Sequence, residues 1–221
     1  MDAEHLFKPH DLLWAVDASS FTSEEALPAW SSSEWLRYAP AVIRRERVAD
    51  PDCLPVGLRG VTRDQRHKAY LRRDCVARWV SPEMLSQAVA LDHTRSLARF
   101  AAIDTLIDIA PMLDALPLAW GPTGSVGFTL ASGIVVLGPD SDLDLLVRAP
   151  RALDAGTINV LCAMETHASC RLDIQIDTGH GAFSFAEWVQ GRRSVLLKTD
   201  AGPLLTHAPW SVGAGAIGRP K

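Results

Sequence analysis

The residues of this chain best suited to chemistry are two small residues and two aspartates. The sequence GPTGSVGF contains Gly124 and Ser125, and DSDLDLLVRAP, a little further on, contains Asp142 and Asp144. In a β-strand, residues two apart project from the same face with Cα atoms roughly 6–7 Å apart, so the two aspartates should lie side by side. Two parallel carboxylates repel each other unless a cation joins them. Mg²⁺, with Mn²⁺ as the alternative, suits such oxygens, especially when phosphate and water fill its remaining sites.

A third acid follows in the sequence CRLDIQIDT. Strict alternation there predicts a strand with Leu172, Ile174 and Ile176 on one face, and Asp173, Gln175 and Asp177 on the other. If this strand lies beside the strand of Asp142, then Asp173 completes a cluster of three carboxylates. Such a cluster could bind one or two metal ions and activate a hydroxyl nucleophile. Asp177 lies nearer the strand end and ranks below Asp173.

The Gly-Ser pair follows the apolar segment LAWG. A glycine there lets the backbone approach a ligand closely, and free N–H groups together with the Ser125 hydroxyl could cradle a phosphate. The segment matches neither the P-loop nor the dinucleotide fingerprint. An isolated D-x-D pair is usually only a solvated strand edge, so the order of the elements carries the inference. That order is a strand, the Gly-Ser turn, a strand with two acids and a strand with a third.

If a phosphate binds at the Gly-Ser turn, basic residues should face it. The segment GLRGVTRDQRHK supplies three arginines and Lys68, although it could equally be a solvated strand edge and turn. Because a guanidinium can bind phosphate through two nitrogens, Arg59 and Arg63 lead the candidates. The full set of candidate phosphate-binding residues is Arg59, Arg63, Arg66, Arg148 and Lys198, together with Gly124 and Ser125.

The length, composition and net charge are those of an ordinary globular protein. It has 221 residues, of which 48% are hydrophobic and 22% charged, and its net charge is −4. This balance argues against disorder, and the absence of a basic field argues against non-specific binding of nucleic acid. No apolar run is long enough to span a bilayer, and the N-terminus lacks the apolar core of a signal peptide. We expect a cytoplasmic protein.

The four cysteines favour the same compartment, because they include no C-x-x-C pair and no framework of close spacings. A zinc site built from Cys162, His167 and Cys170 is an alternative. It lacks a fourth ligand at a suitable spacing, and reduced thiols fit better.

The elements that must position these residues indicate an α+β protein. Residues 1–80 hold short apolar segments separated by turn residues, which predicts a small β-rich domain. Residues 81–210 alternate strands and helices and would form the catalytic domain, a mixed sheet flanked by helices. Its first helix should start with Ser81 as N-cap and Pro82 in the first turn. Residues 211–221 read as a frayed, glycine-rich tail.

Finer expectations concern individual elements of the second domain. A helix that restarts at Asp92 should end at Pro111. The segment IVVLG, residues 134–138, reads as a strand, and it would form a long hairpin between the Gly-Ser turn and the acidic strand. Residues 150–168 read as a helix, and a short helix should be closed by Gly191.

This order of elements resembles the nucleotidyltransferase superfamily, whose polymerase-beta-like palm carries a Gly-Ser turn, a strand with paired acids and a third acid on a neighbouring strand. A closer resemblance extends over nearly the whole chain. The segments HDLLW, PVGLRG, RDQR, SPEML, WGPTGSVGF, DSDLDLLVRAP, LDIQIDT, AFSFAEW and LLKTDAGPLL are together similar to the holo-acyl-carrier-protein synthases of malonate decarboxylase. That family is also called phosphoribosyl-dephospho-CoA transferase.

The resemblance implies a reaction and its partners. The donor would be 2'-(5''-triphosphoribosyl)-3'-dephospho-CoA, and the acceptor a serine of the apo acyl carrier subunit, with pyrophosphate leaving. Asp142 and Asp144 would hold Mg²⁺ against the triphosphate, and Asp173 would help bind a second metal or draw the serine proton. By analogy, a basic surface would receive the acidic carrier.

Two alternatives stay open at this point. Another nucleotidyltransferase could use an ordinary nucleoside triphosphate on a small molecule or protein. A binding module could keep the palm without catalysis, although it would then be expected to lack acids that this chain retains.

Overall fold

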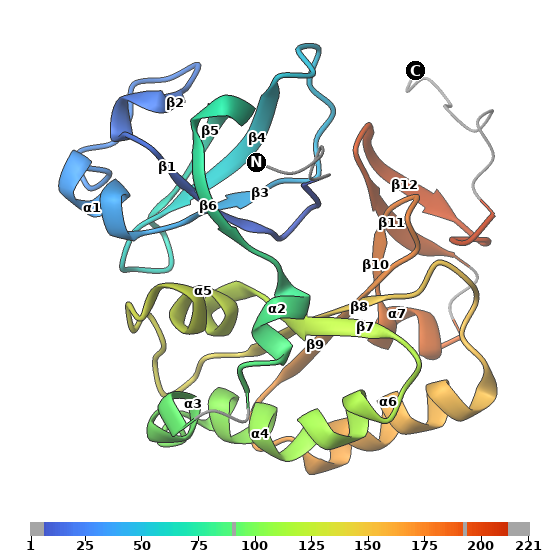
Figure 1. The fold of residues 1–221 in the computed structure, drawn as a ribbon. Coiled ribbons are helices and arrows are strands. Elements are labelled where there is room, and N and C mark those ends of the chain that lie inside the picture. Colours follow the sequence, from blue (N-terminus) through green and yellow to red (C-terminus); the bar gives the residue numbers. More distant parts are fainter. Residues whose placement is uncertain (1–6, 90–91, 192–193, 212–221) are drawn as a thin grey trace.

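The structure is a computed structural model that describes residues 7–89, 92–191 and 194–211. It contains two six-stranded sheets, one in each half of the chain. In Figure 1 the first lies at the upper left, and the second runs from the lower centre up the right-hand side. The first sheet is built from N-terminal residues, and the second carries helices on its flank. This confirms the predicted α+β class. Of the predicted tail, residues 212–221 lie outside the described residues.

The first sheet is antiparallel and has the strand order β2-β5-β4-β3-β1-β6. Its central hairpin pairs β4 with β5 in continuous register from Cys53 opposite Arg72 to Arg59 opposite Arg66. Alternation sorts this hairpin into two faces. One face buries Leu54, Val56, Leu58, Ala69 and Leu71 in the local core. The strands are β1 (Leu12–Ala15), β2 (Phe21–Thr22), β3 (Ala41–Ile43), β4 (Cys53–Arg59), β5 (Arg66–Arg72) and β6 (Val76–Val80).

Short helical elements complete the N-terminal half. The side chain of Ser32 accepts a hydrogen bond from the Trp35 amide and so caps the helix that begins at Ser33. These elements are α1 (Ser33–Tyr38) and two 3₁₀ turns at Ala18–Ser20 and Arg73–Cys75.

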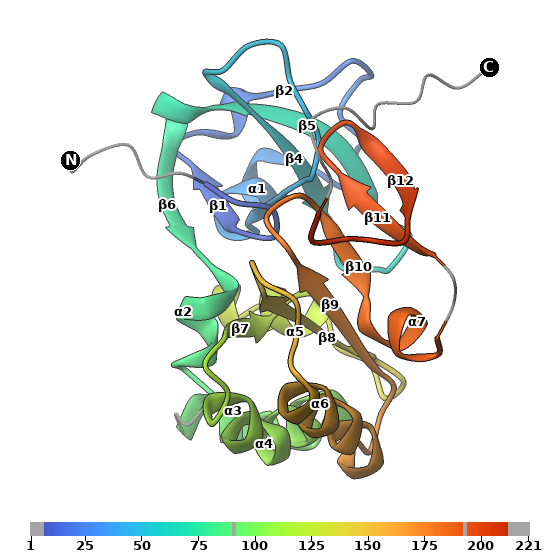
Figure 2. The ribbon, with the colours of Figure 1, turned by 90° about the vertical axis from the view of Figure 1, so that its right-hand side faces the viewer.

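The second sheet has the order β12-β11-β10-β9-β8-β7, in which only β8 and β9 run parallel. The parallel pair needs a crossover, and helix α6 provides it. Figures 1 and 2 show α4 and α6 side by side along one face of this sheet. The largest hydrophobic core of the protein lies between these helices and the sheet. The strands are β7 (Ala119–Pro122), β8 (Leu143–Arg148), β9 (Leu172–Asp177), β10 (Ala182–Ser184), β11 (Val195–Thr199) and β12 (Gly202–Thr206).

The helices of this half begin where their caps predict. Ser81 accepts a hydrogen bond from the Met84 amide at 3.2 Å, with Pro82 in the first turn, as the sequence predicts. Asp154 caps α6 in the same way through the Thr157 amide at 2.7 Å. The helices are α2 (Pro82–Ser86), α3 (Asp92–Ser96), α4 (Ala101–Asp114), α5 (Gly124–Ser132), α6 (Ala155–His167) and α7 (Phe185–Val189).

Two local expectations are wrong. Helix α4 continues through Pro111 to Asp114, because buried Ile109, Ala110 and Leu113 hold its last turns in the core. The segment 134–138 is a loop, and α5 takes the place of the expected hairpin. Both neighbours of β8 are already taken by β7 and β9, so no edge beside it is open to another strand.

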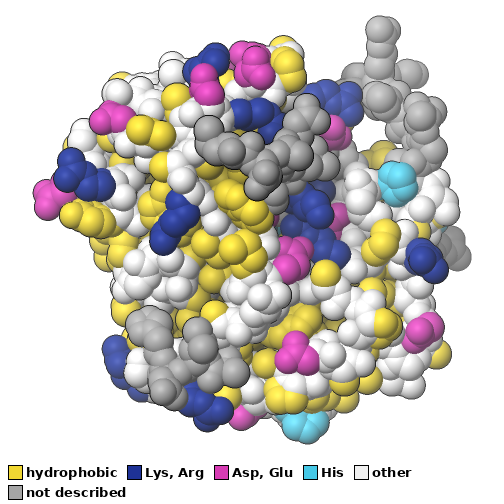
Figure 3. All heavy atoms as spheres, viewed as in Figure 1, with side chains coloured by type: hydrophobic (Ala, Val, Ile, Leu, Met, Phe, Trp, Pro, Cys, Tyr) yellow, Lys and Arg dark blue, Asp and Glu magenta, His cyan; other side chains and the backbone are white. Residues whose placement is uncertain are grey.

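The two halves are joined by ion pairs as well as by apolar contacts. Arg148 on β8 donates to Glu83 at 2.7 Å, to Asp177 at 2.5 Å and to the carbonyl of Pro9 at 3.3 Å. Arg45 reaches the same Asp177 carboxylate from the N-terminal half at 2.9 Å. Figure 3 shows basic and acidic side chains meeting between the upper and lower halves.

Candidate active site between the two sheets

The register of the parallel strands brings the predicted acids together. Asp144 on β8 lies directly opposite Asp173 on β9, and Asp142 immediately precedes β8. Adjacent residues in register project from the same face of a sheet, and so do residues two apart. The intervening Leu143 and Leu145 are fully buried on the opposite face, as the sequence predicts.

The charges of this cluster are poorly compensated. Burial raises the pKa of Asp144 to about 6, and the neighbouring Asp173 and Asp142 carboxylates add to the rise. Within the part of the chain that the structure describes, no donor makes a hydrogen bond to the Asp144 carboxylate. Two arginines form ion pairs with Asp142 instead, Arg63 at 3.5 Å and Arg171 at 3.6 Å. Among the described residues, the Asp144 carboxylate therefore has no ion-paired or hydrogen-bonded cation.

The Gly-Ser turn faces this carboxylate at very close range. Gly124 has a φ of +58°, and a Cβ atom there would come within 1.9 Å of an oxygen of Asp144. Only glycine combines this backbone conformation with this approach. Helix α5 begins at Gly124, so the amide groups of its first turn have no partner within the helix. An anion beside Asp144 would meet these amides, which is the usual arrangement of phosphate sites at helix N-termini.

Arg59 spans from the first sheet to the turn. Its side chain is buried, with 7% of the residue exposed, and one guanidinium nitrogen donates to the Ser125 hydroxyl at 2.8 Å. Its guanidinium lies over the ring of Phe128, 5.2 Å from the ring centre. Burial lowers the pKa of Arg59 to about 10, with the charge of Arg66 adding to the effect, so it remains a cation at neutral pH. Its Nε is buried and has no hydrogen-bond partner among the described residues.

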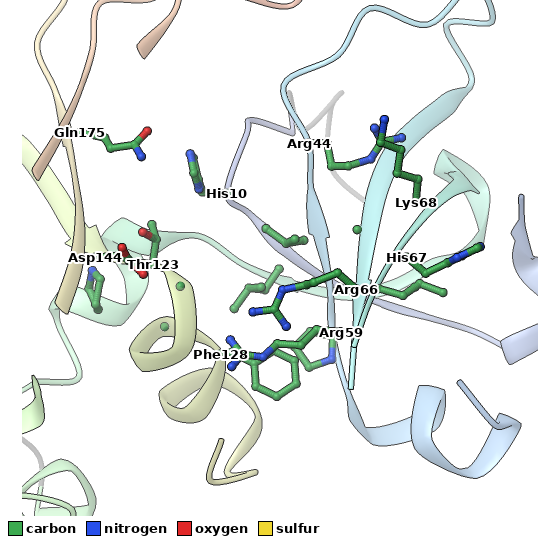
Figure 4. A pocket seen from close by; sticks show the side chains of 18 residues that line it. His10, Arg44, Arg59, Arg66, His67, Lys68, Thr123, Phe128, Asp144 and Gln175 are labelled. Atoms are coloured by element: carbon green, nitrogen blue, oxygen red, sulfur yellow. The ribbon is translucent and has the colours of Figure 1, made fainter. Parts of the chain in front are cut away.

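Two connected cavities surround these groups. The first, of about 320 Å³, is lined by Arg59, Arg63, Arg66, Gly124, Ser125, Asp142 and Asp144, and by the loop 136–141. The second, of about 580 Å³, runs between the first sheet and the start of α5. Arg59, Arg66, Gly124 and Asp144 line both cavities, so the two meet at the acids. Figure 4 shows the second cavity with Asp144 and Thr123 facing the arginines across it.

The donor chemistry of the site fits a hard divalent cation. The residues offered are carboxylates, and their mutual repulsion would be relieved by a positive ion. Among the described residues, no group of three or more His, Cys, Asp or Glu side chains could hold a metal ion unaided. Mg²⁺ does not need such a cage, because it commonly takes one or two carboxylates and completes its shell with water and substrate phosphates. The same finding leaves the alternative zinc site of Cys162, His167 and Cys170 without support.

The structure places the sequence-predicted residues in two groups. Eight of them lie around the cavities and the acid face, namely Asp142, Asp144, Asp173, Gly124, Ser125, Arg59, Arg63 and Arg66. Arg148 and Lys198 are not brought to the acids. Arg148 is four residues further along β8, roughly 13 Å from Asp144 at strand spacing, and is engaged in ion pairs. Lys198 is exposed on β11 and lines neither cavity.

Several residues of the site were not among the candidates. Arg171 precedes β9, and Gln175 follows Asp173 on the same face of that strand. Their positions beside the acids could have been read from the same alternation that identified Asp173. His10 lines the larger cavity in a strained conformation with a φ of 77°. No local signal in the sequence distinguishes it from the other histidines.

Comparison with known proteins identifies the family of this chain. Residues 8–82 match the family model described as the phosphoribosyl-dephospho-CoA transferase MdcG N-terminal domain, and residues 86–209 match the corresponding C-terminal domain. The chain is 38% identical to a phosphoribosyl-dephospho-CoA transferase of Pseudomonas putida, over 92% of this chain and 95% of the relative. Relatives of the same name in Klebsiella pneumoniae and Pseudomonas aeruginosa are 38% and 39% identical, covering 96% and 94% of their lengths.

No solved structure matches the fold. The family matches nevertheless span both halves of the chain that form the site, and the relatives are covered almost completely. The chain belongs to the phosphoribosyl-dephospho-CoA transferase family.

Proposed function

We propose that this protein transfers the phosphoribosyl-dephospho-CoA group from 2'-(5''-triphosphoribosyl)-3'-dephospho-CoA to a serine of the apo acyl carrier subunit of malonate decarboxylase. One observation carries the proposal. Asp144 lies opposite Asp173 across the parallel strands, and Gly124 packs against it so closely that only glycine fits. The acids are thereby held beside a helix N-terminus and a buried arginine, as the transfer of a group from a triphosphate requires.

The reaction would exchange one phosphorus–oxygen bond for another. The serine oxygen of the carrier forms a bond to the α-phosphorus, and the bond from that phosphorus to the β-phosphate oxygen breaks. Pyrophosphate leaves, and the serine proton passes to a base. Asp173 suits that role, since it lies on the same face as the other two acids. When bound, Mg²⁺ held by Asp142 and Asp144 would supply charge neutralisation on the phosphate oxygens.

The remaining residues would bind and orient the triphosphate. Arg59 is fixed by Ser125 and by the ring of Phe128, so its guanidinium needs little reordering to meet a phosphate. Arg63, in the turn after β4, and Arg66, at the start of β5, line the same cavity. The first-turn amides of α5 would bind phosphate oxygens on the side of the leaving group.

Cellular context remains part of the proposal. In the described part of the chain, no helix is long and apolar enough to cross a membrane. The four cysteines are free. We expect the enzyme to work in the cytoplasm, where such thiols stay reduced and where the acidic carrier would dock on a basic surface beside the cavities.

The test is the intact mass of an apo carrier subunit after incubation with the donor, Mg²⁺ and this protein. A mass gain equal to the phosphoribosyl-dephospho-CoA group is expected, and it should be lost with the Asp142→Asn, Asp144→Asn variant. An unmodified carrier, with folded enzyme and a carrier that a relative can modify, would refute the proposal.

A further inference from the structure

The face of the first sheet that lines the larger cavity carries a row of basic side chains. Arg59 pairs with Arg66 in register, and two residues further along the hairpin Gly57 pairs with Lys68. Because strand residues alternate between faces, these four positions share one side, roughly 7 Å apart from pair to pair. Arg44 follows β3 and also lines the cavity. Positive charge thus extends from the acids along the sheet to a second, more distant group.

Between the two basic groups the cavity is apolar. Leu12, Pro40, Val42, Leu58 and Phe128 are among its lining residues. Gly57 adds no side chain to this part of the cavity. A Cβ atom there would come within 3.2 Å of a Val42 methyl group and 3.7 Å of Arg44 Cδ. The cavity therefore has basic side chains at two ends and apolar residues between them.

Arg44 is held in place and retains an unused donor. Its Nε donates to the Val56 carbonyl at 2.9 Å, and Nη1 bonds to Glu46. Its guanidinium lies over the Tyr70 ring, 5.6 Å from the centre. The remaining nitrogen, Nη2, is buried and has no hydrogen-bond partner within the described residues. A buried donor without a partner is costly, so a ligand oxygen that reached it would bind favourably.

Lys68 complements this arginine from the neighbouring strand. It is exposed and lines the same cavity. Among the described residues its ammonium group makes no hydrogen bond or ion pair. Figure 4 shows Arg44 and Lys68 next to each other, away from Arg59 and Arg66. Two cations thus lie together at the far end of a cavity that begins at the acids.

We propose that Arg44 and Lys68 bind the 5'-diphosphate of the dephospho-CoA part of the donor. This inference rests on the proposed function and locates the donor within it. The donor carries a triphosphate and a diphosphate, separated by two ribose rings, one of which bears the adenine. Its triphosphate would lie at the acids and Arg59, its adenosine over Gly57 and Phe128, and its diphosphate at Arg44 and Lys68. An ordinary nucleoside triphosphate has no second phosphate group for this end, so the site would select the larger donor.

Binding of two fragments by the intact protein tests the assignment without any transfer step. The probes are dephospho-CoA and inorganic triphosphate with Mg²⁺, each titrated calorimetrically into wild type, Lys68→Ala, Arg63→Ala and the matched control Lys198→Ala. Lys68→Ala should raise the dissociation constant of dephospho-CoA about tenfold, as expected for one charge-assisted contact, and leave that of triphosphate unchanged. Arg63→Ala should do the reverse, and Lys198→Ala should change neither.

Arg44→Met provides a second variant that should act like Lys68→Ala, with far-ultraviolet circular dichroism as the check on folding. Unchanged dephospho-CoA binding in Lys68→Ala would overturn the assignment, and so would an equal loss of both probes. The proposed function fails separately, through an unmodified carrier, since these fragments bind whether or not transfer occurs.

Discussion

Replacing Asp144 by asparagine should stabilise the metal-free protein while abolishing its proposed activity. The pKa of Asp144 is raised from 3.8 to about 6, mainly by burial and then by Asp173 and Asp142. One pKa unit corresponds to 1.36 kcal/mol, so the ionised carboxylate costs up to about 3 kcal/mol at neutral pH. Partial exposure screens part of this cost, and we expect the variant to gain about 1–3 kcal/mol.

The stability gained by Asp144→Asn should depend on pH. The folded protein holds the Asp144 proton to a higher pH than the unfolded chain, so the cost develops as the pH rises from about 4 to 6. The gain from Asp144→Asn should therefore be full at pH 7.5 and fall to roughly a third of that value at pH 4.5. For a chain of this size, 1 kcal/mol shifts the melting temperature by about 2–4 °C.

Thermal unfolding in chelator at the two pH values provides the assay, with Asp108→Asn as the control. Asp108 is an exposed carboxylate on α4, away from both cavities, and its replacement should change little. Added Mg²⁺ should raise the melting temperature of wild type more than that of Asp144→Asn, since only the carboxylate favours the ion. A variant no more stable than wild type at pH 7.5, or a gain matched by the control, would refute the electrostatic reasoning.

Three further changes follow from the site geometry. Gly124→Ala should reduce transfer at least 100-fold, because its Cβ would meet the Asp144 carboxylate, whereas Gly133→Ala, with a similar φ of +74° but nothing within 4 Å, should only lower the melting temperature. Arg59→Met should raise the dissociation constant of inorganic triphosphate with Mg²⁺ by about tenfold or more in calorimetry, and unchanged binding would remove Arg59 from the phosphate site. Burial, with Arg45 and Arg148 adding to it, lowers the pKa of His10 to about 4, so the contribution of His10 to stability should be lost as the pH falls from 6.5 toward 4. His10→Asn should flatten that loss in melting curves, and His180→Asn, at an exposed position, should not.

The acid cluster could be predicted because it depends on local alternation. Two neighbouring segments place aspartates and leucines on opposite faces, and a helix between them predicts a parallel pair. The register that sets Asp144 opposite Asp173 then follows with little freedom, because a slip by one residue would move the leucines out of the core.

Other elements were missed because tertiary contacts decide them. Strand β1 has the sequence LLWA, in which both faces are largely buried, so no alternation marks it. Residues 134–138 are apolar yet form a loop. Leu137 is buried there while Val135 is 41% exposed, so these side chains pack without a strand partner.

The role of Arg44 also lay beyond sequence reasoning. Its importance comes from the register of β3 and β4 around Gly57 and from the way the first sheet faces α5. Such long-range pairing leaves no local pattern. Arg148 is the opposite case. Its position at the end of the acidic strand suggested a phosphate ligand, but in the structure it joins the two halves of the chain.

The central claim is that the acids and the extended cavity act together on one particular donor. The most direct measurement counts pyrophosphate released and carrier modified in the same reaction, with triphosphoribosyl-dephospho-CoA and with ATP as donors. The account predicts one pyrophosphate per modified carrier with the first donor, negligible modification with ATP, and loss of both products in Asp144→Asn. Efficient modification with ATP, or transfer that persists in Asp144→Asn, would contradict it.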